Sequence, residues 1–178
     1  MAEGGPSRSG TKPVTARPQL DIEIVRQSEA WDGAKVGDDL LTQAALAAFL
    51  AAAPNMAGEI AILLTGDAEM QALNRQWGGK DAATNVLSFP SGGDEGHLGD
   101  VVLAFETVER EAKQQNITIA DHAAHLVVHG VLHLLGYDHE KEDEAVKMET
   151  LETTILATLG IADPYGTSEA VGIRKVSP

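Results

Sequence analysis

The chain has 178 residues and no cysteine, and its 27 acidic and 13 basic side chains give a net charge of −14. This length suits one domain with a substantial core, and the lack of cysteine excludes disulfides and thiolate metal sites. The acidity argues against a broadly basic nucleic-acid-binding surface. No apolar run is long enough to span a membrane and the first residues lack the apolar block of a secretory signal, so we expect a cytoplasmic protein without membrane attachment.

The two ends of the chain lack the periodic apolar pattern of folded elements. Residues 1–18 contain three of the seven prolines, and residues 163–178 are similarly poor in apolar residues. Such segments rarely bury enough apolar surface to become ordered. We therefore expect flexible tails at 1–18 and 163–178 on either side of one domain at 19–162.

Apolar periodicity predicts the elements of that domain. In the first strand, Leu20, Ile22 and Ile24 alternate with acidic residues, which is typical of a half-buried strand. Strands are expected at 20–24, 59–64, 85–89 and 98–104, and helices at 38–53, 67–77, 106–115, 119–135 and 140–159. Because most strands precede most helices, the pattern predicts an α+β fold with a small mixed sheet of about four strands packed with helices.

Half of the six histidines lie at the end of one predicted helix, in the run His129-Gly130-Val131-Leu132-His133-Leu134-Leu135-Gly136-Tyr137-Asp138-His139. His129 and His133 are four residues apart, so their imidazoles share one face of the helix and can bind one ion at about 2.0–2.1 Å each. Gly136 can end the helix in a left-handed turn that brings His139 back. Three neutral nitrogen ligands predict one zinc ion per chain with a fourth position open for water.

Other polar residues near this run have less specific interpretations. His122 and His125 are expected to support the ligands from outside or to lie on the surface. His97 lies in a loop without a partner in the sequence and is expected to be exposed. Asp138 either orients a ligand imidazole through its second nitrogen or is an ordinary turn residue.

The histidine spacing also occurs in zinc proteases of the metzincin type, which carry a glutamate directly after the first histidine. That glutamate is the general base of peptide hydrolysis. Here the position is Gly130. The sequence therefore predicts the metal ligands of a hydrolase that does not cleave peptides.

The histidine run resembles the signature of the bacterial YbeY family of single-strand-specific endoribonucleases. Two further blocks match in order: Leu73-Asn74 with Lys80-Asp81 and Thr84-Asn85-Val86-Leu87-Ser88-Phe89-Pro90, then Leu98-Gly99-Asp100-Val101-Val102 with Glu106-Thr107-Val108. The resemblance covers about residues 20–160 and implies a small mixed sheet packed with helices around the metal-bearing helix. It implies a zinc-dependent ribonuclease that processes ribosomal RNA, especially the 3′ end of the small-subunit RNA, and acts in ribosome quality control. Its partners would be ribosomal RNA, the small ribosomal subunit and assembly factors.

Cleavage of a phosphodiester also needs positive charge near the phosphate. We expect His129, Lys80 and Arg75 to carry the catalytic roles, with Lys80 on a phosphate and Trp77 stacked on an unpaired base. Alternatively, Trp77 covers the core and Lys80 is a solvated loop charge. Members of the family usually carry an arginine where this chain has Gly78, and Arg75 is the nearest residue that could replace its charge.

Two classes of function remain open from the sequence. The first is a metal-dependent endoribonuclease. The second is a ribosome assembly or binding factor in which zinc stabilises the fold and nuclease activity is weak or lost. An open metal site beside a basic phosphate pocket favours the first.

Overall fold

The computed structural model describes residues 19–92 and 96–166. Its elements follow the order β1 (Gln19–Arg26), η1 (Glu29–Ala34), α1 (Asp38–Ala52), β2 (Ala57–Thr65), α2 (Asp67–Leu73), η2 (Asn74–Gly78), β3 (Val86–Pro90), β4 (His97–Ala104), α3 (Phe105–Gln115), α4 (Ile119–Leu134) and α5 (Glu142–Thr158). The segment η1 is a 3-10 helix and η2 is a π-helical turn.

The sheet has four strands in the order β1-β2-β4-β3. Strands β1, β2 and β4 run parallel, and β3 pairs with β4 in the antiparallel direction. The mixed sheet and the α+β class predicted from the sequence are therefore confirmed. The strands also lie where the apolar patterns indicated, with β1 and β2 extending beyond the predicted ends.

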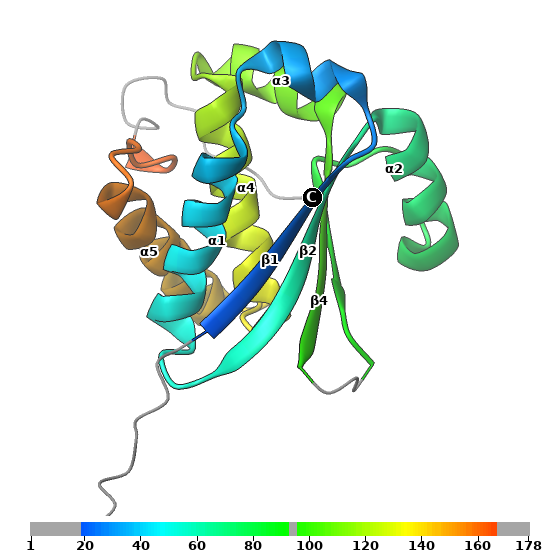
Figure 1. Ribbon diagram of the computed structural model, residues 1–178. Coiled ribbons are helices and arrows are strands. Elements are labelled where there is room, and N and C mark those ends of the chain that lie inside the picture. Colours follow the sequence, from blue (N-terminus) through cyan, green and yellow to red (C-terminus); the bar gives the residue numbers. More distant parts are fainter. Residues whose placement is uncertain (1–18, 93–95, 167–178) are drawn as a thin grey trace, which may run out of the picture.

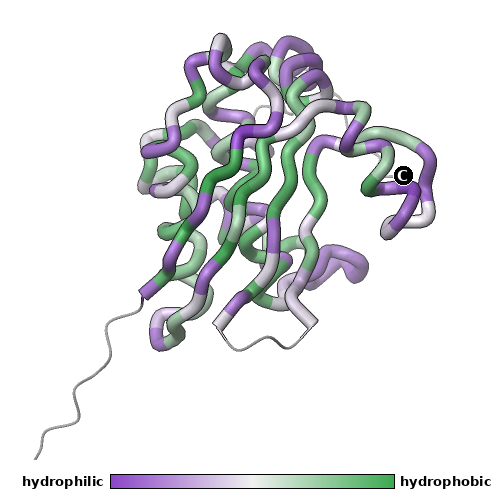
Figure 2. Tube along the Cα trace, turned by 45° about the vertical axis from the view of Figure 1, so that its right-hand side comes forward, coloured by the Kyte–Doolittle hydropathy of each residue, from purple (hydrophilic) through white to green (hydrophobic). Residues whose placement is uncertain are grey.

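Helices lie on both faces of the sheet (Figure 1). On one face are α1, α4 and α5, and on the other is α2. Figure 2 shows hydrophobic residues along the strands and hydrophilic residues mainly on the outer helices and loops. The main core lies beneath α1, α4 and α5, whereas a smaller cluster around Met70, Val102 and Ala104 lies beneath α2.

Helix α4 is the central helix of this arrangement. It contacts β3, β4, α1, α3 and α5, and ten of its sixteen residues are buried. The contact with the sheet is close because position 130 is glycine: a Cβ atom there would lie 2.6 Å from Cγ1 of Val101 on β4. Ser88 on β3 donates a hydrogen bond of 3.0 Å to the carbonyl oxygen of Gly130. The sheet thus fixes the part of α4 that carries the histidine pair.

Two local features were not predicted from the sequence. The 3-10 helix η1 buries Trp31 completely, and the indole Nε1–H donates to the carbonyl of Thr65 at 2.9 Å. The helix predicted at 67–77 is α helical only to Leu73 and continues as the π-helical turn η2. No regular periodicity marks either feature, because one depends on a buried tryptophan and the other on a local change of helical pitch.

The expected tails fall mostly outside the described residues. The N-terminal tail at 1–18 lies outside them, as does the C-terminal segment from 167 onward. Residues 163–166 are described, and Asp163 and Tyr165 form hydrogen bonds with α5, so the packed part of the chain extends past residue 162. Among the described helices, none has the length and apolar character needed to cross a membrane.

Candidate metal centre

The C-terminal half of α4 presents His129 and His133 on one face. The N-cap residue of the helix is Thr118, whose side chain accepts a hydrogen bond of 3.0 Å from the backbone N–H of Asp121. From this start the helix runs without interruption to Leu134. The two Nε2 atoms lie 2.9 Å apart. The predicted pairing of imidazoles four residues apart is therefore confirmed.

The chain turns back directly after α4. Gly136 has a φ of +94°, the left-handed conformation that glycine adopts at little cost. The N–H of Tyr137 bonds the carbonyl of Leu132 and the N–H of Gly136 bonds that of His133, both at 3.0 Å, which is a Schellman motif. This turn brings His139 back to the helix. One nitrogen from each of His129, His133 and His139 then lies within 4.8 Å of the others.

A buried carboxylate from another helix contacts the first histidine. Glu152 on α5 is 0% exposed, and its Oε1 lies at hydrogen-bonding distance from Nδ1 of His129. Burial acts to raise the pKa of Glu152, but hydrogen bonds from His125, His129 and Tyr165 outweigh it and lower the pKa to about 2. When this carboxylate accepts the Nδ1–H of His129, Nε2 of that ring, on the side of His133, is available to bind a metal ion.

These residues fit a metal ion. Burial, together with the positive charges that His129 and His139 carry when protonated, lowers the pKa of His133. The neutral form of His133, which is the form that binds metals, is therefore favoured. Because Nδ1 of His129 contacts Glu152, its Nε2 and the facing nitrogens of His133 and His139 can bind a cation. His139 is exposed while His129 and His133 are half-buried, so the site is open to solvent on one side.

The structure distinguishes between the expectations for the neighbouring polar residues. The carboxylate of Asp138 accepts the backbone N–H of its neighbour His139 at 2.7 Å, which agrees with the alternative of an ordinary turn residue. His97 is half-buried rather than exposed, and its Nε2 lies 3.1 Å from Oδ1 of Asp100. These partners come from turn geometry and strand ends, which the sequence pattern does not specify.

The remaining two histidines are buried and are not part of the ligand cluster. His125 contacts Glu152 at 3.0 Å. Of the two predicted alternatives, support of the ligands from outside therefore describes His125, and a surface position does not. His122 lies 2.7 Å from Glu111 on α3, which also accepts a hydrogen bond from Asn85. The side chain of Asn85 in turn accepts the backbone N–H of Val86, so it holds the backbone where β3 begins.

The predicted phosphate-binding segment is exposed. Trp77 is 67% exposed, so the alternative in which it covers the core is wrong. Arg75 lies 3.8 Å from Asp81, and both side chains are largely exposed. Within residues 19–92 and 96–166, neither Arg75 nor Lys80 has a hydrogen bond or ion pair with the three histidines. Their catalytic roles remain predictions.

Position 78 is crowded. A Cβ atom there would lie 2.1 Å from Oδ1 of Asn74. Asn74 is itself buried, and its Nδ2 donates to the carbonyl of Ala82 at 2.8 Å. Glycine at this position therefore permits the close contact between the π-helical turn and the loop that follows it.

Comparisons with known proteins agree with this architecture. A family model described as "Endoribonuclease YbeY" matches residues 27–160. A protein of that name from Paramagnetospirillum magneticum is 51% identical over 162 residues, which cover 86% of this chain and 98% of the relative. One from Parvibaculum lavamentivorans is 43% identical over 179 residues, covering 93% and 96% of the two chains.

A third relative and a solved structure extend the comparison. The protein of the same name from Rhodospirillum rubrum is 56% identical over 142 residues, which cover 71% of each chain. The solution structure of a protein from Thermotoga maritima covers 88% of this chain and 99% of its own, with a TM-score of 0.53 and 23% identity. At that identity the structural match supports the fold alone.

Proposed function

This chain belongs to the YbeY family of endoribonucleases, and we propose that His129, His133 and His139 hold the metal ion with which it cleaves RNA. Membership supports a metal-dependent endoribonuclease that acts in ribosomal RNA processing. None of these findings favours the alternative of an assembly factor without nuclease activity.

The observation that carries the proposal is the convergence of three histidine nitrogens within 4.8 Å at the open end of a buried helix. When bound there, a metal ion can polarise a phosphoryl oxygen or lower the pKa of a bound water. Three nitrogen ligands and no thiolate favour zinc, at one ion per chain. The solvent-exposed side at His139 gives an RNA phosphate access to the site.

The same geometry argues against peptide hydrolysis. The zinc proteases with this histidine spacing need a glutamate after the first histidine, but position 130 faces the sheet with Val101 Cγ1 2.6 Å from where a Cβ would lie. A glutamate there would clash with the sheet. The protein therefore lacks both the protease base and the room for one.

The substrate-binding residues are part of the proposal. Trp77 is exposed enough to stack on an unpaired base, which favours single-stranded over paired RNA. Lys80 contacts a backbone phosphate, and Arg75, released from Asp81, supplies charge to the developing oxyanion. The substrate would be ribosomal RNA, in particular the 3′ end of the small-subunit RNA, cut in the cytoplasm on or near the small ribosomal subunit and its assembly factors.

An RNA-cleavage assay on the purified full chain tests this function. Single-stranded RNA should be cut in the presence of zinc, and a chelator should stop the reaction. The same sequence annealed to its complement should be cut more slowly, and unfolded casein should survive. Chelator-sensitive cleavage of casein without cleavage of RNA would reverse the assignment.

A further inference from the structure

Glu152 is a charged side chain in the core of the protein. It lies on α5 and is 0% exposed. A buried carboxylate normally needs an ion pair or several hydrogen bonds. Among the described residues no lysine or arginine pairs with it, and its partners are His125, His129 and Tyr165.

The two oxygens of Glu152 have separate partners. Oε1 accepts from Nδ1 of the metal ligand His129. Oε2 accepts from Nε2 of His125 at 3.0 Å and from the hydroxyl of Tyr165. Because Oε2 is held from two directions, the carboxylate cannot rotate freely, and Oε1 stays directed at His129.

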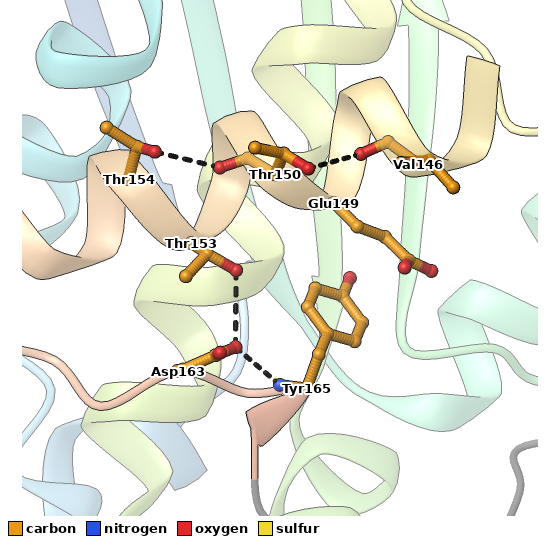
Figure 3. Close-up of a pocket in the computed structure, with 7 residues that line it drawn as sticks. All are labelled: Val146, Glu149, Thr150, Thr153, Thr154, Asp163 and Tyr165. Atoms are coloured by element: carbon orange, nitrogen blue, oxygen red, sulfur yellow. Dashed lines mark hydrogen bonds between the residues drawn. The ribbon is translucent and has the colours of Figure 1, made fainter. Parts of the chain in front are cut away.

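Tyr165 is itself held on α5 by a second carboxylate (Figure 3). Oδ1 of Asp163 accepts a hydrogen bond from Oγ1 of Thr153 on α5 at 3.2 Å and from the backbone N–H of Tyr165 at 2.8 Å. The tyrosine ring extends from this anchor toward the helix. The segment that follows α5 is thereby tied to the helix that carries Glu152.

We infer that Glu152 is a positioning residue of the metal centre, and that the segment 163–165 after α5 holds it in place through the Tyr165 hydroxyl. The inference rests on the metal centre of the proposed function. The chain of contacts runs from Asp163 through Tyr165 and Glu152 to His129, so a segment beyond the last helix contributes to metal affinity. Carboxylates in this relation to a metal-bound histidine fix its tautomer and ring orientation, and their loss typically weakens metal binding about 10–100-fold.

Zinc affinity, measured on the full chain by competition with a chelating dye, tests the inference without RNA. Glu152→Gln should weaken zinc binding about 10–100-fold, and Tyr165→Phe about three- to tenfold, as expected for loss of one hydrogen bond. Glu149→Gln removes the same charge one turn earlier on α5, where the side chain is exposed. This control should bind zinc like the wild type. Equal affinities for Glu152→Gln, Tyr165→Phe and Glu149→Gln would overturn the inference.

The tautomer of His129 gives a second readout, which a merely structural role of Glu152 would not affect. Long-range proton–nitrogen spectra of the metal-free wild type at about pH 8, above the ordinary imidazole pKa, should show His129 protonated on Nδ1. Protonation mainly on Nε2 would overturn the inference, even if Glu152→Gln fails to fold. If the wild type binds no zinc, the proposed function fails, while the tautomer still decides whether Glu152 orients the ring.

Discussion

Gly130 on α4 and Val101 on β4 are in such close contact that a Cβ atom at position 130 would lie 2.6 Å from Cγ1 of Val101. Val101 is fully buried in a central strand and cannot move aside cheaply. The contact seats the histidine-bearing part of α4 on the sheet. It also explains in physical terms why the residue after His129 is glycine and not the glutamate of a protease.

Gly130→Ala should therefore destabilise the protein. Alanine favours a helix over glycine by about 1 kcal/mol, but overpacking a tight core costs about 1–3 kcal/mol, and the contact distance makes the second effect the larger. Thermal unfolding measures the result. Gly33→Ala in η1 is the control, since nothing lies within 4 Å of a Cβ there. A Gly130→Ala variant more stable than the wild type would show that α4 shifts without cost.

Metal content should depend on each of the three ligands. His129→Ala, His133→Ala and His139→Ala should each abolish stoichiometric binding, because two nitrogens alone form a weak site. His97→Ala removes a histidine that contacts Asp100 instead, so it should keep one metal ion per chain. Elemental analysis of the purified variants measures this. One metal ion per chain in all three ligand variants would exclude the assigned site.

Much of this architecture follows from local sequence patterns. The strands and helices were predictable from apolar periodicity, and the histidine cluster from the spacing of His129 and His133 followed by a glycine turn. Those features depend on residues within about ten positions of one another. The sequence pattern therefore identified the three histidines that the structure brings together in the candidate metal centre.

Glu152 was missed because it meets His129 only through the packing of α5 on α4. One signal could have found it: Glu152 lies on the same helix face as Met148 and Ile155, which are both buried. An acidic residue within an apolar helix face needs a buried partner. The partner itself, 23 positions away in the sequence, comes only from the tertiary structure.

Arg75 and Lys80 should supply the positive charge near the phosphate of the RNA substrate. Under single-turnover conditions at saturating metal, Arg75→Ala should slow RNA cleavage by on the order of 10²–10³, the usual cost of losing one preorganised donor to an oxyanion. Lys80→Ala should weaken RNA binding and make it less sensitive to salt, because fewer counterions are released. Arg110→Ala removes an exposed arginine on α3 and should change neither quantity. If Arg75→Ala and Arg110→Ala cleave at the same rate, Arg75 has no role in the reaction.

A side chain at position 78 should cost less stability when Asn74 is shortened. Gly78→Ala forces the Asn74 amide away from the carbonyl of Ala82 and should cost about 1–3 kcal/mol of stability. In an Asn74→Ala background the same substitution should cost less, with a coupling of about 0.5–3 kcal/mol. If thermal unfolding shows that Gly78→Ala and Asn74→Ala lower the stability additively, the contact between positions 78 and 74 is not the cause of the loss. In that background Gly78→Arg, the family's usual residue, should raise the cleavage rate if Arg75 does not already supply the charge.

We propose that His129, His133 and His139 hold the metal ion with which the protein cleaves RNA. The most direct test is the rate of single-stranded RNA cleavage by the wild type and by His133→Ala, each with added zinc and with excess chelator. We expect cleavage only by the wild type with zinc. Equal cleavage by His133→Ala, or by the wild type in excess chelator, would contradict it.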